Sequence, residues 1–240
     1  MHGPFPIDFG EPIPLFPLPM VVLYPHTMLP LHIFERRYRQ MVEDALDHEP
    51  LADGRVGPPI AMAMKVTAPT AEGCFAETRL RPVVCVGHIV HDETFPDGRH
   101  NILVHGTSRA EIVSIEESPQ EQLYLKAMLR QLEPPVGESP SPVVRDALRR
   151  LLAGERLSRM HAAEAVCSWV DQDDIPLETL LEKISFALIK DEEVRYRLLA
   201  EPDCRARARI IHGELERIDR LVSIGDRQNW REWPRHLSWN

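Results

Sequence analysis

The pattern of apolar and polar positions changes character several times along this chain. Between residues 14 and 31, prolines recur at short intervals; each fixes its own φ and biases the preceding residue to extended geometry, so this stretch cannot be a helix. Inside it, residues 20–24 form a short apolar run that predicts a strand buried on both faces. From Phe34 to Leu46 the apolar positions take helical spacing, with charged residues between them. The N-terminal part therefore predicts a strand, a proline loop and an amphipathic helix.

The middle of the chain predicts further strands, most of them separated by turn signals. The candidates are residues 60–66, 83–90, 100–105, 109–116 and 123–132. Several of these runs alternate between apolar and polar residues, which suits a curved sheet with one buried face. Residues 95–99 combine a proline that fixes φ with a glycine that supplies positive φ, so we expect a hairpin tip, with a ligand loop as the alternative. An antiparallel barrel or pseudobarrel is predicted.

Near Pro134 a proline- and serine-rich linker begins, and helical periodicity follows it. The first helix is expected to start at Ser141, with Pro142 at its first helical position, and to stop at Gly154. Three more helices are expected: one at residues 160–170, one from about residue 176, and a long last helix from 204 to 222. We therefore predict three parts: a β-rich lobe (1–134), a helical bundle (135–225) and a tryptophan-rich tail (226–240).

Three segments carry a family resemblance. Residues 14–42 closely resemble the opening of the Lon N-terminal domain, the substrate-recognition module that precedes the ATPase and peptidase parts of Lon protease and also occurs as a free-standing protein. Residues 86–112 resemble a family segment in which two strands flank a turn and lead to a Gly-x-x-Arg turn, here residues 106–109. Residues 198–215 resemble the family's last helices, so the resemblance covers roughly residues 12–222. One departure is His26, where the family commonly has glycine.

The resemblance implies a fold and a function. The fold would be α+β, with an N-terminal PUA-like antiparallel β pseudobarrel lobe that carries one helix, followed by a C-terminal α-helical bundle. The protein would be a non-catalytic polypeptide-recognition module, an adaptor or regulator in protein quality control. Its partners would be unfolded or tagged polypeptides, together with a protease or chaperone. Because the lobe is similar to the PUA fold, an RNA or small-ligand binder is the alternative, and an uncharacterised hydrolase is a third reading.

Composition narrows these classes. The chain has 28 basic and 37 acidic residues, a net charge of −9, which argues against binding duplex nucleic acid through a broad positive face. The alternating arginines 205, 207 and 209 spread over more than one face of the predicted last helix. The four cysteines show no CxxC pair, so reduced thiols in a cytoplasmic protein are expected. No apolar run approaches the roughly 20 residues that span a bilayer, so no membrane association is expected.

Catalytic, cofactor and metal sites are not expected. The sequence has no Gly-Lys dipeptide, which a phosphate loop requires, and its four lysines fall on predicted solvated faces, where they cannot serve a Ser-Lys dyad. His88, His91, His100 and His105 lie on two strands predicted to pair. The first two are three residues apart, a spacing that sends side chains to opposite faces of a strand. No zinc site is therefore predicted.

Partner binding is the remaining role for exposed aromatic and basic residues. Phe95 and Arg99 lie in the predicted turn, and the tail contains Trp230 and Trp233, whose amphipathic indoles suit an interface. Docking of the tail back on the helical lobe is the alternative for the two tryptophans. The candidate partner-binding residues are Tyr24, His26, Phe95, Arg99, Trp230 and Trp233.

Overall fold

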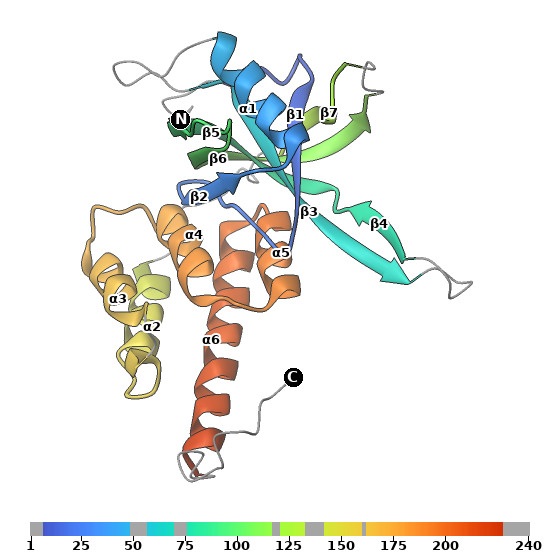
Figure 1. Ribbon diagram of the computed structural model, residues 1–240. Helices are drawn as coiled ribbons and strands as arrows, with labels where there is room; N and C mark the ends of the chain where they lie inside the picture. The colour runs from blue at the N-terminus through green and yellow to red at the C-terminus, as the bar shows by residue number, and fades with distance from the viewer. Residues whose placement is uncertain are drawn as a thin grey trace, which may run out of the picture. The chain divides into compact units, whose positions relative to one another are not determined.

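The computed structural model describes residues 7–48, 57–69, 76–116, 121–132, 142–159 and 162–227 (Figure 1). The chain divides into two compact units. One comprises Met1–Val136 with Lys190–Asp203, and is called the β unit below; the other comprises Gly137–Ile189 with Cys204–Asn240, and is called the helical unit.

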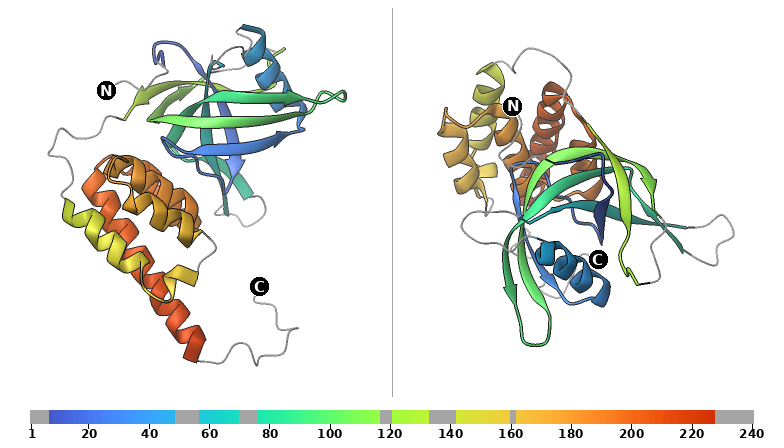
Figure 2. Two further views of the ribbon diagram at one scale, coloured as in Figure 1. Left: turned by 90° about the vertical axis from the view of Figure 1, so that its left-hand side faces the viewer. Right: turned by 90° about the horizontal axis from the view of Figure 1, so that it is seen from above.

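The β unit is built on a closed sheet. Five strands form a ring in the order β1, β7, β6, β5, β3, because β3 also pairs with β1. The β1–β3 pair is parallel and the other pairs are antiparallel. The two remaining strands extend this barrel: β2 pairs with the first part of β6, and β4 with the last part of β3 (Figure 2). The predicted pseudobarrel is thus confirmed, with one parallel pair. The strands are β1 (Ile13–Pro19), β2 (Met28–Ile33), β3 (Pro59–Pro69), β4 (Ala76–Leu80), β5 (Val83–Thr94), β6 (His100–Ile115) and β7 (Lys126–Gln131).

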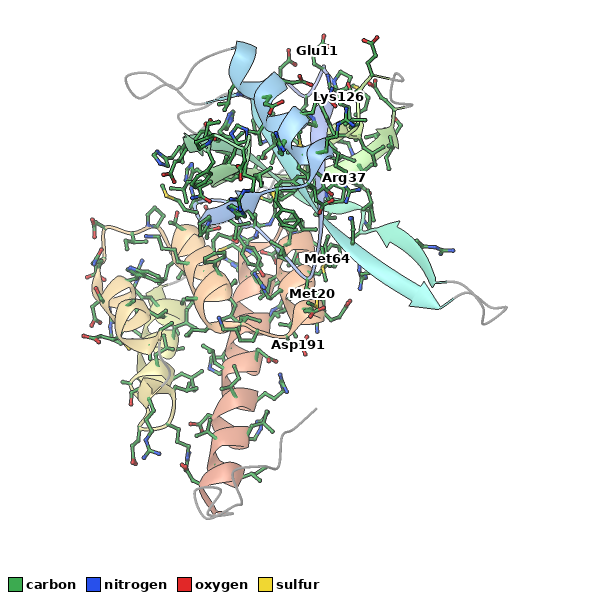
Figure 3. The ribbon with its side chains drawn as sticks, in the orientation of Figure 1. Glu11, Met20, Arg37, Met64, Lys126 and Asp191 are labelled. Carbon is green, nitrogen blue, oxygen red and sulfur yellow. The ribbon has the colours of Figure 1, made fainter. Side chains whose placement is uncertain are left out.

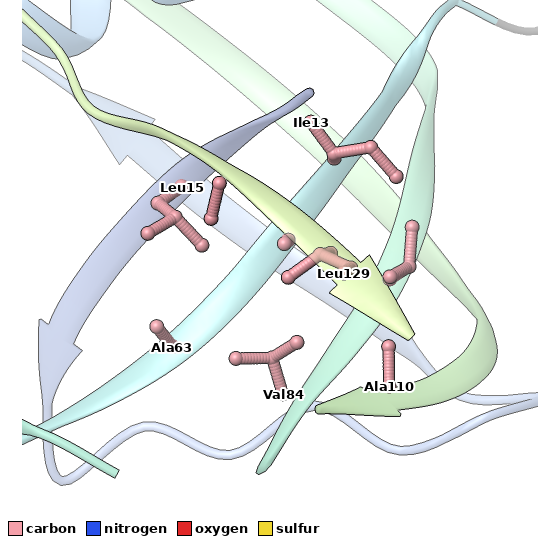
Figure 4. Close-up of a cluster of buried hydrophobic side chains, with 9 residues drawn as sticks. Ile13, Leu15, Ala63, Val84, Ala110 and Leu129 are labelled. Atoms are coloured by element: carbon pink, nitrogen blue, oxygen red, sulfur yellow. The ribbon is translucent and has the colours of Figure 1, made fainter. Parts of the chain in front are cut away.

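Alternate residues of these strands fill the barrel interior. Side chains of a strand point to opposite faces in turn, so every second residue of a barrel strand faces inward. Alanines at several inward positions leave room for larger neighbours on facing strands. The buried cluster consists of Ile13, Leu15, Ala61, Ala63, Val84, Val86, Ala110, Ala127 and Leu129 (Figure 4).

Helix α1 (Arg36–His48) lies against the outside of the barrel (Figure 1). It buries Tyr38, Met41 and Val42, as its apolar period predicts. The Tyr38 ring centroid lies 4.4 Å from that of Phe16 in β1, and the Tyr38 hydroxyl donates to the Pro17 carbonyl at 2.9 Å. Phe34, which the period placed at the start of the buried stripe, precedes the helix and is 64% exposed.

The strand predicted at residues 20–24 is wrong. The strand is β1, which ends at Pro19, and Met20 adopts a positive φ of 60°. Val22 and Tyr24 are buried, but their carbonyls accept from side chains, Arg195 Nη2 at 3.1 Å and Thr27 Oγ1 at 2.8 Å. Burial without ladder pairing leaves the same apolar signature in a sequence as a buried strand does.

The Gly-x-x-Arg turn predicted at residues 106–109 is also wrong, because β6 runs unbroken from His100 to Ile115. Gly106 instead permits a close approach of two backbones. It exchanges backbone hydrogen bonds with the 26–27 segment, and a Cβ at this position would lie 2.1 Å from the Tyr24 carbonyl oxygen. The pairing of β5 and β6 shifts register between Val86 and Gly87, opposite this point.

Helix α5 (Glu192–Ala200) belongs to the β unit, although the sequence placed residues 135–225 in one helical bundle. Arg109 of β6 donates from Nε to the Leu199 carbonyl at 2.9 Å and from Nη2 to the Leu198 carbonyl at 3.3 Å. Asp191, labelled in Figure 3, caps the start of the helix by accepting from the Val194 amide at 3.0 Å. The boundary predicted at residue 134 lies outside the described residues, as do residues 228–240 of the tail predicted at 226–240; residues 226 and 227 are the last two of α6.

The helical unit contains the remaining helices. The helix predicted from Pro142 begins there, and the predicted stripes of the later helices are buried at Leu180, Leu181, Ile184, Ile211 and Leu215. The elements are α2 (Pro142–Leu152), η1 (Leu157–Arg159), α3 (Ala163–Asp171), α4 (Leu177–Leu188) and α6 (Cys204–Arg227).

Candidate functional site

An aromatic cluster forms where β2 ends beside the tip of the β5–β6 hairpin; it consists of His32, Phe34, Phe95 and Arg99. The His32 ring centroid lies 6.2 Å from that of Phe34 and 6.2 Å from that of Phe95. The Arg99 guanidinium lies 5.8 Å from the centre of the Phe95 ring, within the range of a cation–π contact. The cluster therefore offers aromatic rings and a guanidinium group, which is paired with Asp97, on one surface.

A chain of polar contacts orients the imidazole of this cluster. Asn101 Nδ2 donates to Glu93 Oε2 at 2.9 Å, so the Asn101 oxygen is the acceptor facing His32 Nδ1 at 2.8 Å. This places the imidazole proton on Nδ1 and leaves Nε2 as an acceptor toward Arg99 Nη1, 3.4 Å away. Because β2, β6 and β5 each contribute a member, the sheet itself fixes the ring.

The hairpin turn is held by its own hydrogen bonds. The Phe95 amide donates to the Arg99 carbonyl at 2.8 Å, and the Gly98 amide to the Phe95 carbonyl at 2.9 Å. Hydrogen bonds from the Arg99 main-chain amide and guanidinium lower the pKa of Asp97. Gly98 has a φ of +76°, as the sequence predicted for a turn glycine.

The outer edge of β2 continues the cluster. Along β2 the side chains of Met28, Pro30 and His32 are exposed, and Met28 keeps 52% of its surface open. Among the described strands, β2 pairs only with β6. Pro30 has no N–H, which blunts the open edge against pairing with another strand. The apolar side chains of β2 therefore remain exposed to a partner, while position 30 offers no backbone N–H for pairing with another strand.

A cavity of about 560 Å³ opens beside the hairpin at the first turns of α1. The Gln40 side chain holds the far loop in place: its Nε2 donates to the Glu121 carbonyl and its Oε1 accepts from the Leu123 amide, each at 2.8 Å. The cavity is thus lined by charged side chains of both signs, while the Gln40 side-chain amide is already hydrogen-bonded to the loop. Its lining residues are Arg36, Arg39, Gln40, Glu43, Glu121 and Leu123.

The histidines on β5 and β6 lie differently from the prediction. The register shift between Ile89 and His91 is a bulge, and it brings His88 and His91 to the same face, opposite His105 and Leu103. Burial lowers the pKa of His88, and burial together with the charges of His26 and His88 lowers the pKa of His105. Within the described residues, no group of three or more His, Cys, Asp or Glu side chains could hold a metal ion.

The candidate partner-binding residues have different settings. Phe95 and Arg99 come together in the aromatic cluster, as part of the predicted hairpin tip. Tyr24 is fully buried and its hydroxyl donates to the Arg195 carbonyl at 2.8 Å, which gives it a structural role. His26 is exposed, with a φ of 62°, and its amide donates to the Gly106 carbonyl at 2.8 Å. Trp230 and Trp233 lie outside the described residues.

Sequence reasoning missed His32, Phe34 and the arginines of the cavity. Phe34 fits the helical period, which predicts a buried position, and His32 directly follows the proline-spaced stretch, where it belongs to no recognisable binding-site motif. One available signal is the position of Phe34 directly before the helix. A residue outside the helix does not have to follow the helical period, so its burial depends on tertiary contacts alone. Arg36 and Arg39 carry no signal of their own among the many charges of α1.

Comparisons with known proteins agree on one family. Residues 12–217 match the sequence profile of the ATP-dependent protease La (LON) substrate-binding domain. The Lon protease of Escherichia coli strain K12 is 28% identical over 164 residues, which are 68% of this chain and 19% of that protein. The Lon protease of Dictyoglomus thermophilum is 29% identical over 129 residues, 52% of this chain and 14% of that protein. The chain thus spans less than a fifth of these relatives.

Solved structures with the same fold include the N-terminal domain of the Mycobacterium avium complex Lon protease. It superposes with a TM-score of 0.62 at 16% identity and covers 86% of this chain and 98% of that one. The Lon N-terminal domain protein from Xanthomonas campestris gives a TM-score of 0.53 at 20% identity, covering 82% and 94%. In the part of this chain that is described, no helix is both long and apolar enough to cross a bilayer.

Proposed function

The chain belongs to the family of the ATP-dependent protease La (LON) substrate-binding domain, and from this premise we propose that it binds polypeptide segments at the aromatic cluster and the outer face of β2. It acts there as a non-catalytic recognition module, an adaptor or regulator that presents unfolded or tagged polypeptides to a protease or chaperone. The matched part of the larger Lon proteases is their substrate-binding domain, which supports recognition as the shared task.

The observation that carries this proposal is the exposure of large apolar side chains beside a cation. Phe34 is 64% exposed and Met28 52% exposed, at the two ends of the same short stretch of chain. Met28 and Phe34 are joined along the same face of this stretch by the exposed Pro30 and His32, and apolar groups exposed together on a folded surface are typical of interaction sites. Arg99 and Phe95 add the residue types that contribute most at interfaces. An extended peptide with apolar side chains would cover this surface.

RNA binding is the competing function, and the charge of the surface argues against it. The arginine of the cluster is paired with Asp97 at 2.7 Å, and Glu93 lies one strand away in the same polar chain. A phosphate backbone needs a track of uncompensated positive charge. Single-stranded RNA could still stack on the exposed rings, so an RNA pool belongs in the test.

The test is fluorescence-polarisation binding of labelled unfolded peptides, without ATP, to the wild-type protein and to Phe34→Ala. We expect saturable binding that changes little with salt and weakens about tenfold in the variant, because burying a phenylalanine ring contributes roughly 1.5–3 kcal/mol. Val113→Ala is the matched control, since Val113 is 63% exposed on the distal part of β6. Equal affinities for the two variants would contradict the proposed surface, and salt-sensitive binding of the RNA pool alone would favour the competing function.

A further inference from the structure

We propose that the cavity at the start of α1 is a carboxylate-binding site, which holds a carboxylate of the polypeptide bound at the aromatic cluster. This inference rests on the proposed function and names the chemistry of the ligand. The carboxylate is either the C-terminus of the polypeptide or an aspartate or glutamate side chain within it.

Two guanidinium groups that line the cavity carry the inference. Arg36 and Arg39 both line the cavity, and neither side chain makes a hydrogen bond or ion pair in the part of the chain that is described. Nε of Arg39 is buried from solvent with no hydrogen-bond acceptor. This guanidinium is therefore not committed to an acceptor among the described residues, and its remaining N–H groups are the donors that an anion in the cavity could use. Guanidinium groups bind carboxylates through two parallel N–H donors, so this pair suits that ligand.

The hairpin holds Arg39 in position. Its Nη2 atom lies so near Gly98 that a Cβ there would come within 1.9 Å. The charge of Arg39 also contributes to lowering the pKa of Asp97, but the Asp97 carboxylate is hydrogen-bonded to Arg99 at 2.7 Å. Arg39 is therefore placed by the turn without being neutralised by it. The same turn carries Phe95 and Arg99, which links the cavity to the aromatic cluster.

The acidic lining narrows the ligand class. Glu43 and Glu121 also face the cavity, and Glu43 Oε1 lies 3.8 Å from His100 Nε2. A polyanion such as RNA would bring neighbouring phosphates against these two carboxylates. At its C-terminus, or at an aspartate or glutamate, a polypeptide places one carboxylate next to amide N–H donors, so it can satisfy arginines and glutamates together. Leu123, which is 43% exposed, adds an apolar wall for a side chain of the ligand.

The experiment measures the binding of three versions of one labelled peptide. The first has a free C-terminal carboxylate and one internal aspartate, the second is amidated at the C-terminus, and the third has asparagine in place of the aspartate. Each is tested against the wild type, Arg39→Gln and Arg39→Lys, with Arg130→Gln as control because the Arg130 side chain is 70% exposed beside Glu111. Arg39→Lys keeps the positive charge but removes the two parallel N–H donors. It therefore separates the contribution of the charge from that of the two-donor geometry.

We expect Arg39→Gln to weaken binding of the first peptide about tenfold, Arg39→Lys to weaken it less, and Arg130→Gln to leave it unchanged. The modified peptide that binds the wild type more weakly identifies the carboxylate. Weaker binding of the amidated peptide indicates the C-terminus, and weaker binding of the asparagine peptide indicates the aspartate side chain. Equal affinity of all three peptides for the wild type and Arg39→Gln would overturn the carboxylate site and leave the proposed function intact. If no peptide binds the wild type, the proposed function and this inference both fail. Phe34→Ala is measured with the same peptides: if it weakens binding of all three while Arg39→Gln weakens none, the function stands and this inference fails.

Discussion

The guanidinium of Arg39 lies directly against Gly98, with Nη2 1.9 Å from the place that a Cβ of residue 98 would occupy. Helix α1 and the β5–β6 hairpin are therefore in contact at this point, because Gly98 has no side chain and leaves room for the Arg39 guanidinium. A substitution at Gly98 would therefore also displace Arg39, which lines the cavity.

The first prediction concerns Gly98→Ala. The residue has a φ of +76°, where an L side chain costs roughly 1–2 kcal/mol, and the new methyl group would also displace Arg39. We expect a lower free energy of unfolding in urea and, in the same variant, weaker binding of carboxylate peptides.

Gly213→Ala is the control for this prediction. Gly213 lies in α6 at an ordinary helical position, and nothing is found within 4 Å of a Cβ built there. Alanine is preferred to glycine in a helix by about 1 kcal/mol, so this variant should be more stable than the wild type. If Gly98→Ala raises the urea midpoint, as Gly213→Ala is expected to do, the account of Gly98 is wrong.

The second prediction concerns Arg109→Lys. Arg109 is 8% exposed and its guanidinium serves two carbonyls at the end of α5, those of Leu198 and Leu199. Lysine keeps the charge but cannot reach both acceptors with the same planar group. We expect a loss of roughly 1.5–3 kcal/mol of stability and faster amide exchange in α5. Arg130→Lys, on an exposed side chain, should change neither quantity measurably.

The place of α5 shows what the sequence could and could not predict. Periodicity located α1, α4 and α6, because each buries a stripe over several turns. Helix α5 has only nine residues, and it is held by Arg109, by Tyr196, whose hydroxyl accepts from the Val83 amide at 3.0 Å, and by Tyr24. These contacts join residues far apart in the chain, and no local pattern distinguishes Arg109 from a solvated arginine.

The same distinction between local and long-range contacts explains why only part of the candidate site could be predicted from the sequence. Turn chemistry is local, so Phe95 and Arg99 could be assigned to a hairpin tip from proline and glycine alone. The approach of His32 to that tip depends on the pairing of β2 with β6, in which His32 faces Asn101. The departure at His26 also has an explanation: its φ of 62° is a conformation that glycine adopts most readily, which fits the glycine common in the family.

The third prediction is that acid destabilises the protein through His88 before the carboxylates titrate. Burial lowers the pKa of His88 in the folded state, so below the ordinary histidine pKa of 6.5 the unfolded chain binds more protons than the folded one. Stability is then fully present above that pH and is lost as the pH falls toward the folded pKa. The urea midpoint should decrease between pH 7.5 and pH 5.5.

His88→Gln should flatten this dependence. Nδ1 of His88 donates to the Gly57 carbonyl at 2.9 Å, and glutamine retains a donor without a titrating group. Since the charge of His88 also contributes to lowering the pKa of His105, part of the effect at His105 should disappear with it. His212→Gln is the control, on a side chain that is 41% exposed in α6. An unchanged slope in His88→Gln would show that other groups control the acid response.

The fourth prediction concerns the ion pair of Arg207 and Glu182 in the helical unit. Their side chains are 5% and 2% exposed, and Arg207 Nε lies 3.1 Å from Glu182 Oε1. The sequence placed the arginines of α6 on more than one face, and the structure shows Arg205 and Arg209 exposed on either side of the buried Arg207.

Removing one partner of a buried pair leaves the other charge without compensation, at a cost of roughly 3–5 kcal/mol. Replacing both by apolar residues of similar size avoids that cost and the desolvation of two charges. We therefore expect Glu182→Leu and Arg207→Met each to be strongly destabilising in urea, and the double variant to recover most of the loss.

The exposed pair Arg159–Glu155 is the control for this cycle, with side chains 53% and 84% exposed. Solvent screens such a pair, so removing either partner should change stability by only about 0–1 kcal/mol. If the double variant of the buried pair loses the sum of the two single losses, the residues act independently and each is held by other neighbours. Recovery in the double variant would instead show that the two residues are coupled and that the pair adds little net stability.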